Sequence, residues 1–197
     1  MNSESLETGL PSREMAEELL EEAERCNKGP WVNHSRNVAL CAEKIAISCG
    51  MDGNKAYILG LLHDIGRKFG ARHLGHVYDG YKYMLEFGFT QVAKICLTHS
   101  FGIQDIKTYI GNFDILESEQ LELKIALTSV KYDDYDRLIQ ICDALGAAEG
   151  VVDIEARMQD VKNRYGNYPQ EKWDKNIELK KYFENLANKD IYEIVDK

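Results

Sequence analysis

Hydrophobic residues recur at helical spacing along almost the whole chain. Near the N-terminus, Met15, Leu19 and Ala23 fall on one stripe, separated by mostly charged side chains, as in an amphipathic helix that buries one face. Only three prolines interrupt the sequence, and runs of β-branched residues, which favour strands, are scarce. The pattern therefore predicts an all-α fold.

Breaks in this pattern set the expected helix boundaries. Ser12 is a candidate N-cap, Gly29-Pro30 ends the first helix, and Gly50 ends the second, because glycine is favoured just past a helix C-terminus. A basic, glycine-containing loop is expected at 66–75, and a weakly patterned connection with room for a short helix at 100–118. Helices are expected at about 12–27, 33–49, 54–65, 76–87, 90–99, 119–130, 134–145, 153–165 and 170–189.

The composition is typical of a globular protein of one domain with extensions. Of the 197 residues, 44% are apolar and 29% are charged, enough for a sizeable core and a solvated surface. The net charge of −9 argues against nonspecific binding to nucleic acid or to anionic membranes. An anionic substrate is still compatible with it, because a bound metal ion can reverse the local field.

The sequence also predicts a cytoplasmic location. No apolar run approaches the ~18 residues that suggest a membrane span, and the acidic N-terminal residues 1–7 lack the pattern of a signal peptide. The cysteines contain no Cys-x-x-Cys pair, and a reduced state as small core residues is expected for them. They are Cys26, Cys41, Cys49, Cys96 and Cys142.

The pair His63-Asp64 carries the clearest chemical signal. It closes the apolar stretch 56–62, and a buried histidine next to a buried aspartate is costly unless something satisfies both. A divalent metal ion would do so, because neutral imidazole and carboxylate are common ligands of such ions. His34, His99 and Asp143 also fall near helix ends or on apolar stripes, so we expect several helices to bring ligands to one cavity.

The ordered set His34, His63-Asp64 and Asp143 resembles that of the HD-domain metal-dependent phosphohydrolases, over roughly residues 30–150. The resemblance implies an HD-domain helical bundle for that range. Residues 1–29 would then add an N-terminal helix packed on the core, and 151–197 would add helices that cover the same domain. It also implies hydrolysis by water that a metal activates for attack on phosphorus.

Some members of this family hold two metal ions through two additional histidines. His76, followed by Gly80 four residues on, and His99 match that pattern, and His73 is a rival to His76. The resemblance then implies that His34, His63 and Asp143 hold one ion, that His76 and His99 hold the other, and that Asp64 bridges them. Without His76 the site would hold one ion. Either way the cofactor would be Fe, Mn, Ni, Co, Zn or Mg.

Within the family, two branches invite comparison. The six-ligand set resembles the bacterial diadenosine tetraphosphate hydrolases of the HD type, but Cys142-Asp143-Ala144 stands where those proteins have Ala-Asp-Tyr. The cyclic-dinucleotide phosphodiesterases match less well, because their Gly-Tyr-Pro signature is missing. The resemblance therefore implies a small phosphorylated, nucleotide-like substrate, cleaved at a phosphomonoester, phosphodiester or anhydride bond.

Catalytic roles are expected for Asp64, Arg67 and Asp143. Arg67 lies three residues after Asp64, and its planar guanidinium suits phosphate binding, although a positive cap on the preceding helix is an equal explanation. Asp143 is a candidate proton acceptor. Lys68 and Arg72 are weaker candidates for phosphate binding, and Tyr78, Tyr81 and Tyr83 either wall a base pocket or pack between helices.

Two other classes of function are compatible with the same residues. The six-ligand set is also used by di-iron oxygenases of this fold, which would need His76 and His99 as iron ligands. A noncatalytic nucleotide-binding module could keep the metal as a structural element. The sequence leaves the oligomeric state open, and a homo-oligomer is compatible with it.

Overall fold

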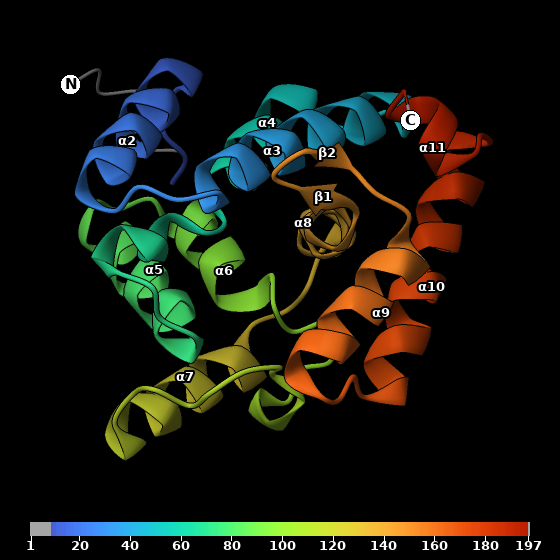
Figure 1. Cartoon of the computed structure of the whole chain (residues 1–197). Helices are drawn as coiled ribbons and strands as arrows, with labels where there is room; N and C mark the ends of the chain where they lie inside the picture. The colour runs from blue at the N-terminus through green and yellow to red at the C-terminus, as the bar shows by residue number, and fades with distance from the viewer. Residues whose placement is uncertain (1–8, 197) are drawn as a thin grey trace.

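The computed structural model describes residues 9–196 and confirms the all-α prediction (Figure 1). Helices account for nearly all of the regular structure, and the described strands form one two-stranded antiparallel hairpin. The α-helices are α2 (Arg13–Cys26), α3 (Trp31–Ser48), α4 (Gly53–Leu62), α5 (Leu74–Glu86), α6 (Thr90–Thr98), α7 (Glu117–Ser129), α8 (Asp134–Leu145), α9 (Ile154–Tyr165), α10 (Gln170–Ala187) and α11 (Ile191–Ile194). The 3-10 helices are η1 (Ile65–Phe69) and η2 (Ile106–Thr108), and the strands are β1 (Gly146–Ala147) and β2 (Gly150–Val151).

The centre of the molecule is a layer of closely packed helices. Helices α3 and α4 lie side by side, α5 pairs with α6, and α8, seen end-on in Figure 1, packs against α3, α4 and α6. Gly60 allows the close approach of α3 and α4, because a Cβ there would lie 2.9 Å from the Cα of Ala39. The apolar faces of these helices meet in one buried cluster that includes Leu20, Ile45, Leu62 and Leu138.

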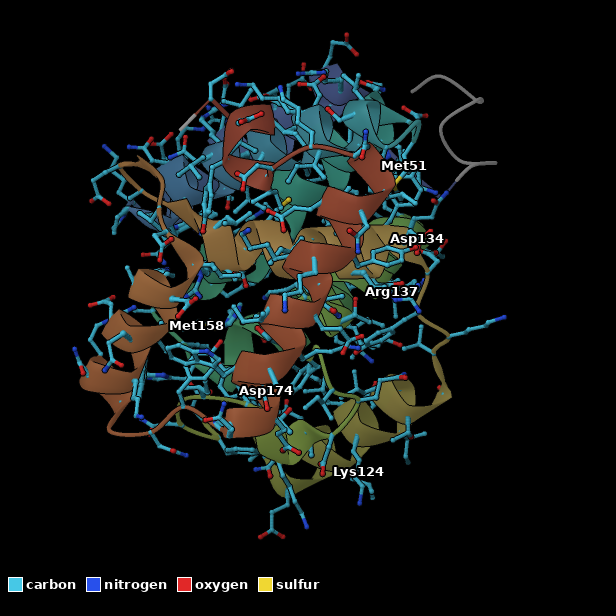
Figure 2. All side chains as sticks on the ribbon, turned by 90° about the vertical axis from the view of Figure 1, so that its right-hand side faces the viewer. Met51, Lys124, Asp134, Arg137, Met158 and Asp174 are labelled. Carbon is cyan, nitrogen blue, oxygen red and sulfur yellow. The ribbon has the colours of Figure 1, made fainter. Side chains whose placement is uncertain are left out.

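Helices α9 and α10 cover one side of this layer. Ile154 and Met158 of α9 and Leu179 and Phe183 of α10 are buried in the same hydrophobic cluster as the central helices. Figure 2 is viewed from this side and shows α10 crossing the front of the molecule, with Met158 on the neighbouring α9. The C-terminal helices therefore share the core of the helices that precede them.

The segment 66–75 differs from the predicted loop. It contains most of η1 and the first residues of α5, which begins two residues before His76. The start of α5 is capped from a distant loop, because the Asp114 carboxylate accepts hydrogen bonds from the backbone N–H groups of His73 (2.7 Å) and Gly75 (2.8 Å). A cap that comes from 39 or more residues away leaves no local signal in the sequence.

One helix boundary and two short elements also differ from the prediction. Helix α4 ends at Leu62, not near residue 65, and Asp64 leaves the helical conformation with a φ of −103°. The hairpin β1–β2 and the one-turn helix α11 were not predicted, because elements of two to four residues are too short to show a hydrophobic period. The expected short helix in 100–118 is present as η2.

The cysteines are free thiols, and most are buried as expected. Cys41, Cys96 and Cys142 are buried in the core and Cys49 is half-buried, whereas Cys26 is exposed at the end of α2. The expectation that every cysteine lies in the core is therefore wrong for Cys26. Among residues 9–196, none of the helices has the length and apolar character needed to cross a bilayer.

Candidate metal centre

Six histidine and aspartate side chains from five helix ends meet in the middle of the molecule. His34 lies in the first turn of α3 and His76 in the first turn of α5. His63 and His99 directly follow α4 and α6, and Asp143 lies in the last turn of α8. Asp64 completes the set: His34, His63, Asp64, His76, His99 and Asp143, all six residues that the sequence singled out as ligands.

One half of the set joins α3, α4 and α8. The Nε2 atom of His34 lies 3.2 Å from Nε2 of His63 and 3.1 Å from Oδ1 of Asp143. The Nε2 atom of His63 lies 3.8 Å from the same Asp143 oxygen. These spacings allow the three atoms to contact one ion.

The other half joins α5 and α6 through Asp64. Oδ1 of Asp64 lies 3.1 Å from Nε2 of His76 and 3.5 Å from Nε2 of His99, and the two nitrogens are 3.3 Å apart. The second carboxylate oxygen, Oδ2, lies 3.9 Å from Nε2 of His63. Asp64 therefore lies between the two halves and offers one oxygen to each, the geometry expected of a bridging carboxylate.

The hydrogen bonds of the four imidazoles show that the set fits a metal ion. Each Nδ1 atom lies within hydrogen-bond distance of a backbone carbonyl: Gly146 for His34, Gly60 for His63, His73 for His76, and Cys96 for His99. Where an imidazole is neutral and its Nδ1 atom carries the proton, its Nε2 atom is an unprotonated lone pair that can bind a metal ion. The Nε2 atoms of His34 and His63 lie 3.2 Å apart and those of His76 and His99 3.3 Å apart, so each pair needs a proton or a metal ion between its two nitrogens.

The protonation states of the candidate ligands also fit a metal ion. Burial lowers the pKa of His63 to about 4, and burial together with the positive charge of Arg67 lowers the pKa of His76. Burial alone would raise the pKa of Asp64, but attraction to the positive charge of Arg67 holds it well below its usual value. Two of the imidazoles are thus neutral at pH 7 while Asp64 is ionised, the protonation state that metal binding requires.

His34 and Asp143 form a coupled pair at the edge of this set. Burial opposes the charged form of each, but their mutual hydrogen bond prevails, so the pKa of His34 is raised and that of Asp143 is lowered. The Asp143 side chain is 31% exposed, whereas that of Asp64 is 4% exposed. Asp143 is therefore the carboxylate of the set that a bound substrate can reach.

The structure separates His76 from its rival, His73. The ring of His73 lies outside the cluster, half-buried against Tyr165, with ring centroids 6.1 Å apart. Its backbone carbonyl accepts the hydrogen bond from Nδ1 of His76. His73 thus orients a candidate ligand through its main chain.

Of the three cations in the basic segment, Arg67 enters the site. Its Nε atom donates to Oδ2 of Asp64, and its side chain lines the cleft above the cluster. Lys68 instead pairs with Glu22 (2.7 Å) and Arg72 with Asp79 (2.6 Å). Arg67 therefore contacts a candidate metal ligand directly, a contact that a role as the positive cap of the preceding helix would not require.

A network between α6 and α8 fixes the helix that ends at His99. The buried carboxylate of Asp136 accepts a hydrogen bond from the hydroxyl of Thr98 (2.8 Å) and pairs with Lys94 (2.6 Å). The side-chain amide of Gln140 donates to the Thr98 carbonyl (3.0 Å). Buried hydrogen bonds of this kind favour one geometry, so these residues position His99, although the side-chain oxygen of Gln140 has no partner among the described residues.

A two-lobed cleft opens from the cluster to solvent. Arg67, His76, His99, Ser100 and Asp143 line both lobes, which have volumes of about 220 Å³ and 350 Å³. The first lobe is also lined by residues from the connection after α6, from α8 and from the C-terminal helices. They include Tyr109, Gln140, Arg157, Arg164, Tyr165, Tyr168 and Lys172.

The sequence did not predict this second group of cleft residues. Tyr165, Tyr168 and the cations of α9 and α10 belong to the segment that was expected only to cover the domain. The tyrosines proposed for a base pocket lie elsewhere: Tyr78 and Tyr81 pack against a second hydrophobic cluster, and Tyr83 bonds to Lys68. A charged segment with interspersed aromatic residues has the same sequence pattern whether it faces solvent or a cleft. The sequence therefore contained no local signal for these cleft residues.

The family model of the HD domain matches residues 31–148. The match spans more than half of the chain and all six residues of the cluster, so the chain belongs to the HD domain family. This result confirms the resemblance on which the sequence-based prediction depended. No protein of curated function and no solved structure gives a significant match to the chain.

Proposed function

We propose that this protein is a metal-dependent phosphohydrolase that cleaves a small nucleotide-like phosphate ester or anhydride. The observation that carries the proposal is the buried pair of ligand trios that share Asp64, with Arg67 beside them at the base of an open cleft. Membership of a family of metal-dependent hydrolases supports the reaction class.

We assign the six side chains of the cluster to two divalent ions. His34, His63 and Asp143 would hold one, His76 and His99 the other, and Asp64 would contact both. When bound, such ions supply a water of lowered pKa and neutralise charge on the phosphoryl oxygens. Mixed imidazole and carboxylate ligands suit Mn, Fe, Co, Ni or Zn better than Mg.

The remaining work falls to two side chains at the cleft. Arg67 presents its guanidinium to a phosphoryl oxygen while Asp64 fixes its orientation from behind. Asp143 is ionised at neutral pH and partly exposed, so it can accept a hydrogen bond from the attacking water and orient it. The buried, largely apolar surroundings of α4 and α6 strengthen both interactions by excluding bulk water.

The test is hydrolysis of p-nitrophenyl phosphate, bis(p-nitrophenyl) phosphate and a panel of nucleotides with each candidate metal. We expect turnover that a chelator abolishes and added metal restores. The Arg67→Gln variant should lose about 10²–10³ in kcat/KM, because one donor to the developing charge is removed. Arg72→Gln is the matched control, since Arg72 pairs with Asp79 outside the cluster. Turnover insensitive to the chelator, or equal losses in both variants, would refute the proposal.

A further inference from the structure

Besides Arg67, the cleft is lined by three positive charges. Arg157 and Arg164 of α9 and Lys172 of α10 line the lobe of about 220 Å³, and the two arginines also line the other lobe. The whole chain carries a net charge of −9. A concentration of cations in one cleft of an acidic protein requires a local cause, and a bound anion is the usual one.

Lys172 is a half-buried cation close to the cluster. Its Nζ atom donates to the backbone carbonyl of Ser100 (2.8 Å), the residue after His99. Within residues 9–196 this ammonium contacts no carboxylate, and burial lowers its pKa to about 8. Attraction to Asp143 opposes this effect of burial without forming an ion pair. Withdrawing an ammonium from solvent without a paired carboxylate costs free energy, which an anion in the cleft would recover.

The two arginines share one carboxylate. Arg164 donates to Oδ2 of Asp160 at 3.0 Å, and a guanidinium nitrogen of Arg157 lies 3.8 Å from the same oxygen. One aspartate thus faces two guanidinium groups, and the wall keeps a surplus of positive charge. A guanidinium held from one side by a carboxylate is oriented to receive an anion on its other donors.

The acids of the cleft do not cancel this charge. Asp64 and Glu149 line only the lobe of about 350 Å³, and Asp64 already pairs with Arg67. Asp143 lines both lobes and is assigned to a metal ion. A substrate with a single phosphoryl group, bound at the metal ions and Arg67, would leave Arg157, Arg164 and Lys172 without a bound anion. The second lobe is therefore a place for further negative charge on the same substrate.

We propose that Arg157, Arg164 and Lys172 form a second anion subsite, which selects substrates that carry at least two phosphoryl groups. The inference rests on the proposed function and adds its substrate class. In a nucleoside polyphosphate or another bisphosphorylated compound, one phosphoryl group would lie at the metal centre and the next against α9 and α10. These helices lie outside the matched range 31–148, so the choice of substrate belongs to the C-terminal segment of this chain.

The test is calorimetric binding to the metal-loaded protein. The probes are imidodiphosphate, in which an N–H group replaces the bridging oxygen, and inorganic phosphate, which carries one group. The double variant Arg157→Gln/Lys172→Gln should weaken imidodiphosphate binding about tenfold or more, because two charge-assisted hydrogen bonds are lost. Phosphate binding should change less than about threefold, which also reports that the fold and the metal centre are intact.

Lys175→Gln is the matched control, because it removes the same charge from the same helix while Lys175 pairs with Glu178 (2.8 Å). It should bind both probes as the wild type does. If the wild type binds imidodiphosphate no more tightly than phosphate, or if the double variant weakens both probes equally, the subsite is refuted. Turnover of bis(p-nitrophenyl) phosphate is measured in parallel. If the double variant selectively loses imidodiphosphate binding but the wild type shows no turnover, the subsite is supported and the proposed hydrolase activity is refuted.

Discussion

Replacing Asp64 with asparagine is expected to abolish both metal binding and hydrolysis. One oxygen of this carboxylate faces His76 and His99, and the other faces His63 and Arg67. Asparagine keeps the size of the side chain but removes its charge and replaces one acceptor with a donor. Both ions would lose a ligand and Arg67 its partner, so kcat/KM should fall by about 10³ or more.

The measurement is metal content by elemental analysis together with kcat/KM, after circular dichroism has shown that the variant is folded. Asp79→Asn is the control: it also removes a carboxylate from an ion pair with an arginine, here Arg72 at 2.6 Å, but Asp79 pairs with none of the six cluster residues. It should keep its metal and its activity. Asp64→Asn with full turnover would contradict the assignment of the cluster as the active site.

Replacing Gly66 with alanine should cause the largest loss of stability. A Cβ at this position would lie 2.5 Å from the backbone nitrogen of Gly80 and closer still to the carbonyl of His76. Backbone atoms of a helix cannot move aside as the end of a flexible side chain can, so η1 and α5 would be forced apart. We expect a loss near the upper end of the ~1–3 kcal/mol found for overpacked cores.

The displacement should also affect the metal centre, because α5 carries His76. Thermal unfolding and metal content of Gly66→Ala measure the two effects, and we expect a lower Tm and selective loss of one ion. Gly102→Ala is the control, since a Cβ there would meet its nearest neighbour, a side-chain carbon of Lys175, at 3.4 Å, an ordinary contact. A Gly66→Ala protein with unchanged Tm would show that the close approach of η1 and α5 is not required.

Much of the metal centre was predictable because its residues lie at helix ends. Helical spacing and breaks placed His34 and Asp143 close to the ends of two helices, and the apolar run before His63 showed that this pair is buried. The choice of His76 over His73 had a physical reason that only the structure shows. Gly80, four residues after His76, packs against Gly66 and brings α5 close enough for His76 to reach Asp64.

The cleft wall was not predictable, because it depends on how distant helices pack. Arg157 and Lys172 lie on charged helices whose sequence would suit a solvent-exposed cover equally well. Met158 and Leu179 on the same helices are buried in the common core, and this tertiary packing orients Arg157 and Lys172 toward the cleft. The cap that Asp114 provides for α5 escaped prediction for the same reason.

The central claim is a centre of two metal ions, and counting them tests it most directly. The measurement is the metal content of protein purified without added metal, beside the variants His76→Ala and His73→Ala. We predict two equivalents in the wild type, one in His76→Ala and two in His73→Ala, because of these two histidines it is His76 that directs a ring nitrogen at Asp64 (3.1 Å). One equivalent in all three proteins would contradict the claim and leave a mononuclear site at His34, His63 and Asp143.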